Sequence, residues 1–532
     1  MACEDAFIYV RSQFLMLSPR FRWVFCQLET LRHCLPPSVR RILAELPETL
    51  DATYERILQE IPKSNQVHSH RLLQCLTVAV RPLRVKELAE ILAIDFGTSG
   101  GIPKLNEVLR WEDQEQAVLS ACSSLIAVIG IGDRDSRVVQ FSHFSVKEFL
   151  TSDRLAVSKM DASRYHHIPP EPAHTIMAQA SLGVLLRLDP HVDGVSIKDF
   201  PLAQYAAEHF GDHAEFESVL SHIWDGVDYL LDANKSHFAV WFWVHRGRWS
   251  RSNEPPLYYV ASRGYRGLVD YLISKRPEDM DVRCYYGTPL HAALEWRHVD
   301  VAQLLLGRHV NVDVRGYLDR TPLHLAAYRG LSDVTRTLVD RNADINVRDS
   351  VGDTPLHRAM RDWSGTPESI QDGCLDVVKI LLGHGADPDA KNDNHSTPLH
   401  HASYYGSVKG AQLMLEHGAN IHARAGGGHT PLHRVLVGLN AYSITLDIVL
   451  DTMRCLLADG ANVDALDNDH MTPLHLASRD GCVEGARLLL EHGANVHLED
   501  KMGRTPFQVA SEQSKANITQ LLSEHLQSQQ NM

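Results

Sequence analysis

The stretch TPLHLAAYRG, Thr321–Gly330, decides the fold of the second half of this chain. Thr321 is suited to cap a helix, because its hydroxyl accepts a hydrogen bond from a backbone N–H left free in the first turn. Pro322 fits the first helical position, which needs no donor. His324 stands three residues after the threonine, where a polar side chain reaches back to the cap. The stretch therefore predicts a capped helix, and its leucine and alanines supply a small apolar face for close stacking.

The TPLH motif recurs throughout the second half. It begins at Thr288, Thr321, Thr354, Thr397, Thr430 and Thr472. A weaker TPFQ begins at Thr505, and PPLYYVASRG at Pro255 keeps the same frame before the first TPLH. Most intervals between these threonines are 33 residues, whereas the units that begin at Thr354 and Thr430 are longer. Eight units therefore tile the chain from Pro255 to about His525, and each is predicted to form helix, turn, helix and β-turn.

This repeat closely resembles the ankyrin repeat, which carries the same T-P-L-H signature at a period of 33. One such unit cannot bury its own apolar face, so the resemblance implies a one-dimensional stack of neighbouring units. It also implies a concave surface for recognition and no chemistry of its own. The histidines of TPLH and of the HGA helix ends, such as His384, are then structural, and we expect no metal site because no HExxH or paired Cys/His spacing occurs.

Partner-binding candidates lie at the end of each first helix of the repeats. Aromatic and arginine side chains dominate the energetics of protein interfaces, so we select these types at the expected helix ends. The candidates are Trp296, Tyr328, Arg329, Tyr404, Tyr405 and Arg479. An alternative interpretation is that the tyrosines only extend the packing within the stack, and the sequence leaves both interpretations open.

The two longer units carry inserts between their two helices. These are WSGTPESIQD, Trp363–Asp372, and a stretch around VGLNAYSIT, Val437–Thr445. The two units are next-but-one neighbours, so we expect both inserts on one side of the solenoid, where such insertions often bind partners. Tolerated loop drift is the alternative, because longer loops cost little stability. The first insert shifts the expected helix-ending glycine of its unit to Gly373.

The first half predicts helices followed by a two-stranded wing. The helical runs are His70–Val80 and Val85–Ile94, and the β-branched runs are Ser123–Ile131 and Ser136–Phe141, joined by a GDRD turn. This order predicts a winged-helix-like domain over 65–155. Further helical stretches predict a linker bundle over 156–254. The expected fold class is mainly α, with these two regions followed by an α-solenoid over 255–526 and a polar tail at 527–532.

Several motifs of the first half resemble the region after the nucleotide domain in fungal NACHT-type (STAND) signalling ATPases. They are FRWVFCQLETLR at Phe21, LPETLDATYERIL at Leu46, RPLRVKELAEILAIDF at Arg81, FSHFSVKEFLTSDRL at Phe141 and PLAQYAAEHF at Pro201. The resemblance covers about Phe21 to Arg246. It implies that 21–64 is a helical remnant following a NACHT domain, after an atypical N-terminal segment at 1–20.

The sequence contains no nucleotide-binding motif. No G-x-x-x-x-G-K-[ST] phosphate loop occurs, although such a loop supplies the clustered N–H groups and lysine that hold a triphosphate. By resemblance, His143 occupies the position of a histidine that contacts ADP in related ATPases. The interpretation favoured here is structural, with His143 orienting the strand-to-helix turn by bonding either Ser145 or a backbone carbonyl. GTSGG at 97–101 is a poor nucleophile elbow, because a helix precedes it. We expect no cofactor and no catalysis.

The composition narrows the partners and the compartment. A formal charge of −14 argues against binding a phosphate backbone, and VKELAEILAIDF, taken as the DNA-reading helix of a winged helix, carries three acids and one lysine. No apolar run approaches the roughly 18 residues that a membrane span needs. Nine scattered cysteines without CxxC indicate a reducing compartment, either cytoplasm or nucleus.

These observations predict a non-enzymatic adaptor that binds a protein partner through the concave ankyrin surface, without nucleic acid, membrane or small-molecule substrate. By resemblance, the setting is fungal signalling or non-self recognition. The alternative is the regulatory and sensor portion of a nucleotide-switched NACHT ATPase whose catalytic domain is absent from this chain, with His143 as a true sensor.

Overall fold

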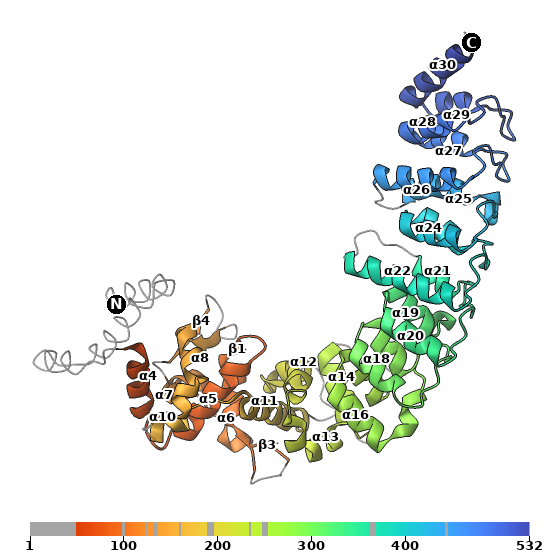
Figure 1. Cartoon of the computed structure of the whole chain (residues 1–532). Helices are drawn as coiled ribbons and strands as arrows, with labels where there is room; N and C mark the ends of the chain where they lie inside the picture. The colour runs from red at the N-terminus through yellow and green to blue at the C-terminus, as the bar shows by residue number, and fades with distance from the viewer. Residues whose placement is uncertain are drawn as a thin grey trace, which may run out of the picture. The chain divides into compact units, whose positions relative to one another are not determined.

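The computed structural model describes residues 49–97, 102–122, 125–130, 137–158, 161–188, 196–232, 236–246, 254–360, 368–441 and 445–530. The chain forms two compact units, Met1–Arg251 and Ser252–Met532 (Figure 1). The predicted segment 1–20, most of the remnant at 21–64, the GTSGG serine and the GDRD turn lie outside the described residues.

The first unit contains a winged helix. Its elements are α4 (Leu50–Gln59), α5 (Gln66–Val78), β1 (Leu83–Arg84), α6 (Val85–Leu92), α7 (Gln114–Cys122), β4 (Ile126–Ile129), β5 (Val138–Phe141) and α8 (Phe144–Leu150). The strands form an antiparallel sheet in the order β1-β5-β4, with Ile126 opposite Phe141 in the wing. The two predicted strands are thus present, each shorter than its β-branched run.

Two features of this unit were not predicted from the sequence. A second small sheet pairs β2 (Ile94–Asp95) with β3 (Lys104–Leu105), and two-residue strands are too short to show an alternating pattern. The helix directly before the wing is α7, which carries no lysine or arginine. The helix taken from sequence as the DNA-reading one, α6, has seven of its eight residues buried. That assignment was wrong, because packing rather than charge places α6 inside the domain.

Buried glutamates join α6 to the segments around it. Glu87 accepts two hydrogen bonds from the Arg81 guanidinium, at 2.7 and 2.9 Å, and caps the helix through the Arg84 backbone N–H. Glu90 accepts the backbone N–H of Leu202 at 2.7 Å and a bond from Arg110. Burial raises the pKa of the Glu90 carboxyl. The Leu202 contact joins the winged helix to the helical linker, and the arginine contacts offset the burial of both carboxylates.

The helical linker packs around two long helices, α11 (Pro170–Leu185) and α12 (Ala203–Ala214). Its other helices are α9 (Asp153–Ala156), α10 (Asp161–Tyr165), α13 (Trp224–Leu230) and α14 (His237–Arg246), with 3₁₀ turns η4 (Ser196–Asp199) and η5 (Val219–His222). A further 3₁₀ turn, η2 (Glu107–Leu109), lies before α7 in the winged helix. Trp241 of α14 is fully buried and donates its indole N–H to the Ala207 carbonyl at 2.9 Å. The predicted helical bundle is therefore present.

The second unit is a row of eight helix pairs among the residues described (Figure 1). The pairs are α15 (Pro256–Arg263) with α16 (Arg266–Lys275), α17 (Pro289–Glu295) with α18 (Val299–Leu306), α19 (Pro322–Arg329) with α20 (Ser332–Asp340), α21 (Pro355–Ala359) with α22 (Glu368–Gly383), α23 (Pro398–Tyr404) with α24 (Val408–Glu416), α25 (Pro431–Ala441) with α26 (Leu446–Ala458), α27 (Pro473–Asp480) with α28 (Val483–Glu491), and α29 (Pro506–Glu512) with α30 (Ala516–Gln530). Each first helix packs on the first helix of the next pair.

The predicted cap at each TPLH motif is present. In the third unit, His324 Nδ1 accepts the Thr321 backbone N–H at 3.1 Å and lies 3.0 Å from the Thr321 hydroxyl. The other ring nitrogen, Nε2, donates to the Asp353 carbonyl of the next unit at 3.0 Å. The same pair of contacts is made by His291, His357, His400, His433 and His475. One histidine thus caps its own helix and joins it to the next repeat.

The inserts of the longer units mainly lengthen helices. The described part of the first insert forms the start of the 16-residue α22, and the second extends both α25 and α26. Residues 361–367 and 442–444 lie outside the described residues. Gly373 lies inside α22, so its assignment as a helix-ending glycine was wrong. A Cβ there would approach the Gly330 carbonyl oxygen to 2.4 Å, and close contact between neighbouring repeats explains the glycine.

The segments that connect successive pairs form projecting β-turn fingers. We number them from finger 1, residues 276–287, through finger 2 (307–320) and finger 3 (341–353) to finger 7, which precedes α29. Adjacent tips are hydrogen-bonded through the backbone, as from Tyr317 N–H to the Tyr286 carbonyl and from Ser350 N–H to the Leu318 carbonyl. At the finger bases, the Asp281 and Asp313 carboxylates accept backbone N–H groups of the following finger at 3.0 and 3.1 Å. The fingers therefore form a continuous edge.

Candidate functional site

Two candidate residues are well exposed at neighbouring helix ends. Trp296 follows α17 with 62% of its surface exposed, and Tyr328 in α19 is 39% exposed. Between them, Arg329 forms an ion pair with Glu295 of the preceding repeat. The Arg329 guanidinium also lies 5.3 Å from the centre of the Tyr328 ring. The structure therefore brings Trp296, Tyr328 and Arg329 together on the second and third repeats, with the ion pair fixing their relative position.

Tyr404 and Tyr405 are instead engaged in the stack. Both are half-buried, and their ring centres are 5.0 Å apart. The guanidinium of Arg434, from the next repeat, lies 4.8 Å from the centre of the Tyr404 ring. Burial beside these tyrosines lowers the pKa of Arg434. These contacts favour the interpretation that this pair extends the packing within the stack, because Arg434 of the next repeat covers the Tyr404 ring.

Arg479 is also committed to a local contact. Its Nε and Nη2 each donate to the Asp480 carboxylate at 2.9 Å. The hydrogen bonds to Asp480 raise the pKa of Arg479. The six candidates are therefore not equivalent, and the exposed surface is concentrated on the second and third repeats.

The sequence search missed an exposed aromatic group on the fingers. Tyr285 and Tyr286 of finger 1 and Tyr317 of finger 2 are 72%, 51% and 43% exposed. Their ring centres lie 5.0 to 6.0 Å apart. The signal was available in the sequence, because all three lie shortly before a TPLH motif, where the other fingers carry mostly polar residues and glycine. The turn tips are variable positions of such repeats, but the predicted candidates all lie at helix ends.

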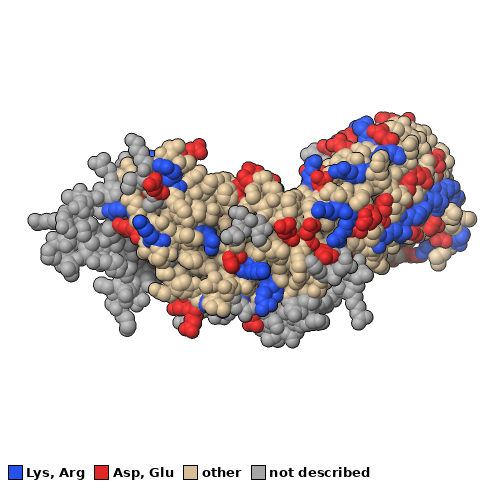
Figure 2. All heavy atoms as spheres, turned by 90° about the horizontal axis from the view of Figure 1, so that it is seen from below, with Lys and Arg blue, Asp and Glu red and all other residues tan. Residues whose placement is uncertain are grey.

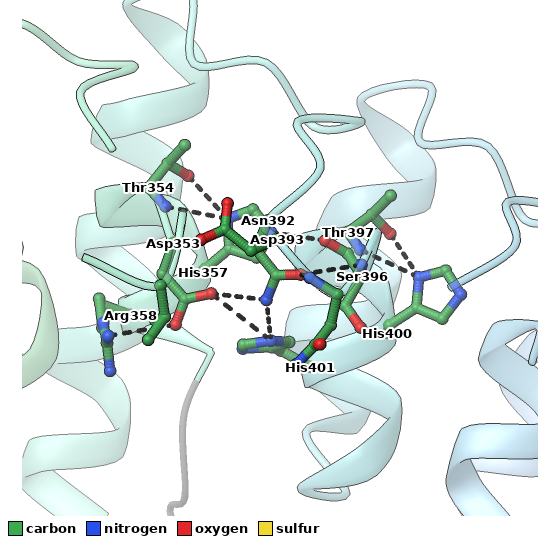
Figure 3. Close-up of polar contacts among 12 residues, drawn as sticks. Asp353, Thr354, His357, Arg358, Asn392, Asp393, Ser396, Thr397, His400 and His401 are labelled. Atoms are coloured by element: carbon green, nitrogen blue, oxygen red, sulfur yellow. Dashed lines mark hydrogen bonds and ion pairs between the residues drawn. The ribbon is translucent and has the colours of Figure 1, made fainter. Parts of the chain in front are cut away.

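A buried polar network lies between the fourth and fifth repeats (Figure 3). Arg358 donates to Asp349 at 2.8 Å and lies 3.3 Å from Asp353, and both carboxylates are buried. Asn392 donates to Asp353 at 2.8 Å, with His401 beside them. Burial lowers the pKa of His401, so its ring is neutral near pH 7. Arg358 is the cation that faces both carboxylates, and Arg320 lies 3.8 Å from Asp349.

This network has the features of a structural tie. Its members come from finger 3, finger 4 and the first helices α21 and α23, so it fixes two repeats to each other. Every charged group in it has an opposite charge or an amide as partner. Within the part of the chain that the structure describes, no group of three or more His, Cys, Asp or Glu side chains is placed to hold a metal ion.

His143 occupies the turn between the wing and α8. Its Nδ1 accepts the Ser145 backbone N–H at 3.1 Å and lies 2.5 Å from the Ser145 hydroxyl. That hydroxyl is in turn 2.9 Å from the Tyr54 hydroxyl of α4. The predicted bond between His143 and Ser145 is therefore present, and the histidine serves as the N-cap of α8.

Comparisons with known families agree with this architecture. Ankyrin repeats match residues 221–317, 368–442 and 442–532 in one family and 307–359 in a second. The family described as GPI inositol-deacylase, winged helix domain, matches residues 54–160. The chain thus contains ankyrin repeats and a winged helix. The winged-helix match is to a family other than the NACHT-type ATPases, so that resemblance stays a prediction.

One curated relative is the azaphilone pigments biosynthesis cluster protein L of Monascus ruber. It is 29% identical over 296 residues, which make up 51% of this chain and 61% of the relative. The chain therefore matches less than two thirds of the length of that protein. Among the described helices, none is both long and apolar enough to cross a bilayer.

Proposed function

We propose that this chain is a non-enzymatic adaptor whose ankyrin repeats bind a protein partner. The observation that carries the proposal is the exposed pair Trp296 and Tyr328, held on adjacent repeats by the ion pair of Glu295 and Arg329. Aromatic side chains that stay exposed on a rigid scaffold bind at low entropic cost, because little conformational freedom is lost on association. A recognition role therefore fits this surface.

The repeats provide such a rigid scaffold, and the proposal assigns them no catalytic role. The residues that sequence patterns single out as reactive have structural partners where they are described: the TPLH histidines cap helices, and His143 caps α8. Ankyrin repeats of this kind recognise proteins through surface shape and side chains. The proposal includes no cofactor, no metal, and neither nucleic acid nor a small molecule as the partner.

The proposed setting is signalling or non-self recognition in the cytoplasm or nucleus of a fungal cell. The likeness to fungal NACHT-type proteins supports this setting. The curated relative, whose name places it in a pigment biosynthesis cluster, supports a fungal source and leaves the process open. The adaptor role does not depend on which of these processes it serves.

The experiment that tests the proposal is chemical crosslinking of the full chain in cells, followed by identification of partners. Recovered proteins are then purified and their affinity is measured for the full chain and for a variant with Trp296→Ala and Tyr328→Ala. The adaptor role predicts a direct partner whose affinity falls about tenfold or more in the variant. Absence of any direct partner would contradict it.

A further inference from the structure

The tips of fingers 1 to 3 form an exposed apolar surface that the helix-end residues do not explain. Its aromatic part is the contacting group of Tyr285, Tyr286 and Tyr317. Leu318 and Val351, both exposed, continue it along fingers 2 and 3. We call these five residues the tip surface. Apolar side chains of this size in a continuous exposed row mark interaction sites more often than isolated ones do.

The backbone holds this surface rigidly. The Tyr317 N–H to Tyr286 carbonyl bond, 3.3 Å, and the Ser350 N–H to Leu318 carbonyl bond, 3.0 Å, link the three tips. Leu318 adopts a left-handed conformation, with φ of 57°. This conformation costs a non-glycine residue about 1–2 kcal/mol of conformational free energy. Finger 5 has glycine, Gly427, at the equivalent position three residues before the TPLH threonine, so leucine at the tip is not required by the turn.

Basic side chains accompany the tip surface. Fingers 2 to 5 each carry a cation at the position six residues before the TPLH threonine. Finger 1 carries a cation five residues before its threonine. These are Arg283, Arg315, Arg348, Lys391 and Arg424, and all five are exposed. The corresponding residues of fingers 6 and 7 are Leu466 and Glu499. Figure 2 shows Lys and Arg side chains on the repeat unit with Asp and Glu side chains among them.

The cations beside the tyrosines keep their charge available. Arg315 donates to the Arg348 backbone carbonyl at 3.0 Å, and a carbonyl does not neutralise it. Arg348 is paired with Asp393 at 2.8 Å, so finger 3 contributes less. The Asp281 and Asp313 carboxylates accept backbone N–H groups at the finger bases, and they likewise keep their charge. Finger 2 also carries the exposed carboxylate of Asp319, against the two exposed arginines Arg283 and Arg315 of fingers 1 and 2.

We propose that the tip surface binds an acidic linear segment of a partner protein, one that carries at least one apolar or aromatic side chain. The inference rests on the proposed adaptor function and names the kind of partner. The tyrosine rings and Leu318 receive the apolar side chain, and Arg283 and Arg315 bind carboxylates, for which the guanidinium geometry is suited. Arg283 and Arg315 also select against a basic group beside the tyrosines, since like charges at an interface are strongly unfavourable.

The probe is a displayed library of random linear peptides selected on the full chain. The expected result is enrichment of peptides rich in Asp and Glu around an apolar residue. Their affinity should fall about tenfold or more in Tyr285→Ala/Tyr317→Ala and in Arg283→Glu/Arg315→Glu, and should weaken as salt is raised. The matched control is Met502→Ala, which truncates an exposed apolar tip on finger 7 and should leave binding unchanged.

Three results would overturn the proposal. The first is that selected peptides are neutral or basic, or that selection on the original chain enriches no peptide beyond those enriched by selection on the Tyr285→Ala/Tyr317→Ala variant. The second is that acidic peptides bind the tip variants as tightly as the original chain. The third is that single-stranded DNA binds equally well and independently of the tyrosines, which would identify a simple polyanion effect. A cellular partner lost with Trp296→Ala/Tyr328→Ala but kept by the tip variants would leave the adaptor function standing while refuting this inference.

Discussion

His324 Nε2 donates a hydrogen bond to the carbonyl oxygen of Asp353, 29 residues further along the chain and in the next repeat. Because Nδ1 of the same ring accepts the Thr321 N–H, the ring must be neutral, with its proton on Nε2. A second proton would leave two N–H groups pointing at each other. The capping histidines therefore link the stability of the stack to pH.

The first prediction concerns this linkage. Burial lowers the pKa of His291, His324, His400 and His433 to about 4. The unfolded chain binds a proton near pH 6.5 and the folded chain does not, so stability is full above pH 6.5 and falls as pH drops towards 4. We expect a loss of about 1 kcal/mol per histidine at pH 5.5, measured by urea unfolding.

The control for this prediction comes from the chain itself. The last repeat uses Gln508 in place of the capping histidine, and its amide oxygen accepts the Thr505 N–H at 2.8 Å. His324→Gln should therefore keep the cap while removing one titrating group, so that the loss of stability between pH 7 and 5.5 becomes smaller. An unchanged pH dependence in this variant would show that His324 does not contribute to the linkage.

The second prediction concerns the glycine inside α22. Gly373→Ala should destabilise the chain by about 1–3 kcal/mol, because the added methyl meets the Gly330 carbonyl oxygen. Alanine is otherwise the better helix former by about 1 kcal/mol. Gly383→Ala, in the same helix with nothing within 4 Å, is the control and should be neutral or stabilising. Thermal unfolding of both variants decides the question.

The third prediction separates packing from binding among the helix-end residues. Tyr404→Ala should lower the free energy of unfolding by about 2 kcal/mol, because it removes the ring that Arg434 covers. Trp296→Ala should change it by less than about 0.5 kcal/mol, since that side chain is mainly exposed. Chemical denaturation measures both. Equal stability of the two variants would return Tyr404 to the list of binding candidates.

The fourth prediction concerns the buried ion pair. Arg358→Met should lower the free energy of unfolding by about 3–5 kcal/mol, because it removes the buried guanidinium that bonds Asp349 and faces Asp353, and leaves only Arg320, 3.8 Å from Asp349, as a nearby arginine. Arg348→Met removes an exposed arginine paired with Asp393 and should cost no more than about 1 kcal/mol. If the two substitutions lower the free energy of unfolding in urea by the same amount, the network between these repeats is not a structural tie.

The fifth prediction concerns nucleotide and His143. We expect no saturable binding of ATP or ADP to the purified chain by isothermal titration calorimetry. His143→Ala should lower stability by about 1 kcal/mol through loss of the N-cap of α8, and His143→Asn should restore most of it, because asparagine caps well. Micromolar nucleotide affinity that His143→Ala abolishes would instead establish the sensor portion of an ATPase switch.

The repeat, its caps and its helix order were predictable because they depend on short-range chemistry. Threonine, proline and histidine at fixed spacing specify a capped helix within four residues, and the 33-residue period specifies a stack. The bond between His143 and Ser145 was predictable for the same reason, since the two residues lie in one turn.

Only the tertiary structure decided which side chains face solvent. Tyr328 and Tyr404 occupy equivalent positions, yet Tyr404 is covered by Arg434 from the following repeat, and that contact depends on a residue 30 positions away. The burial of α6, the helical form of the inserts and the meeting of three tyrosines on separate fingers likewise depend on neighbours in space. The sequence by itself determined a stack of capped helices, and packing between distant segments decided the surface that this stack presents.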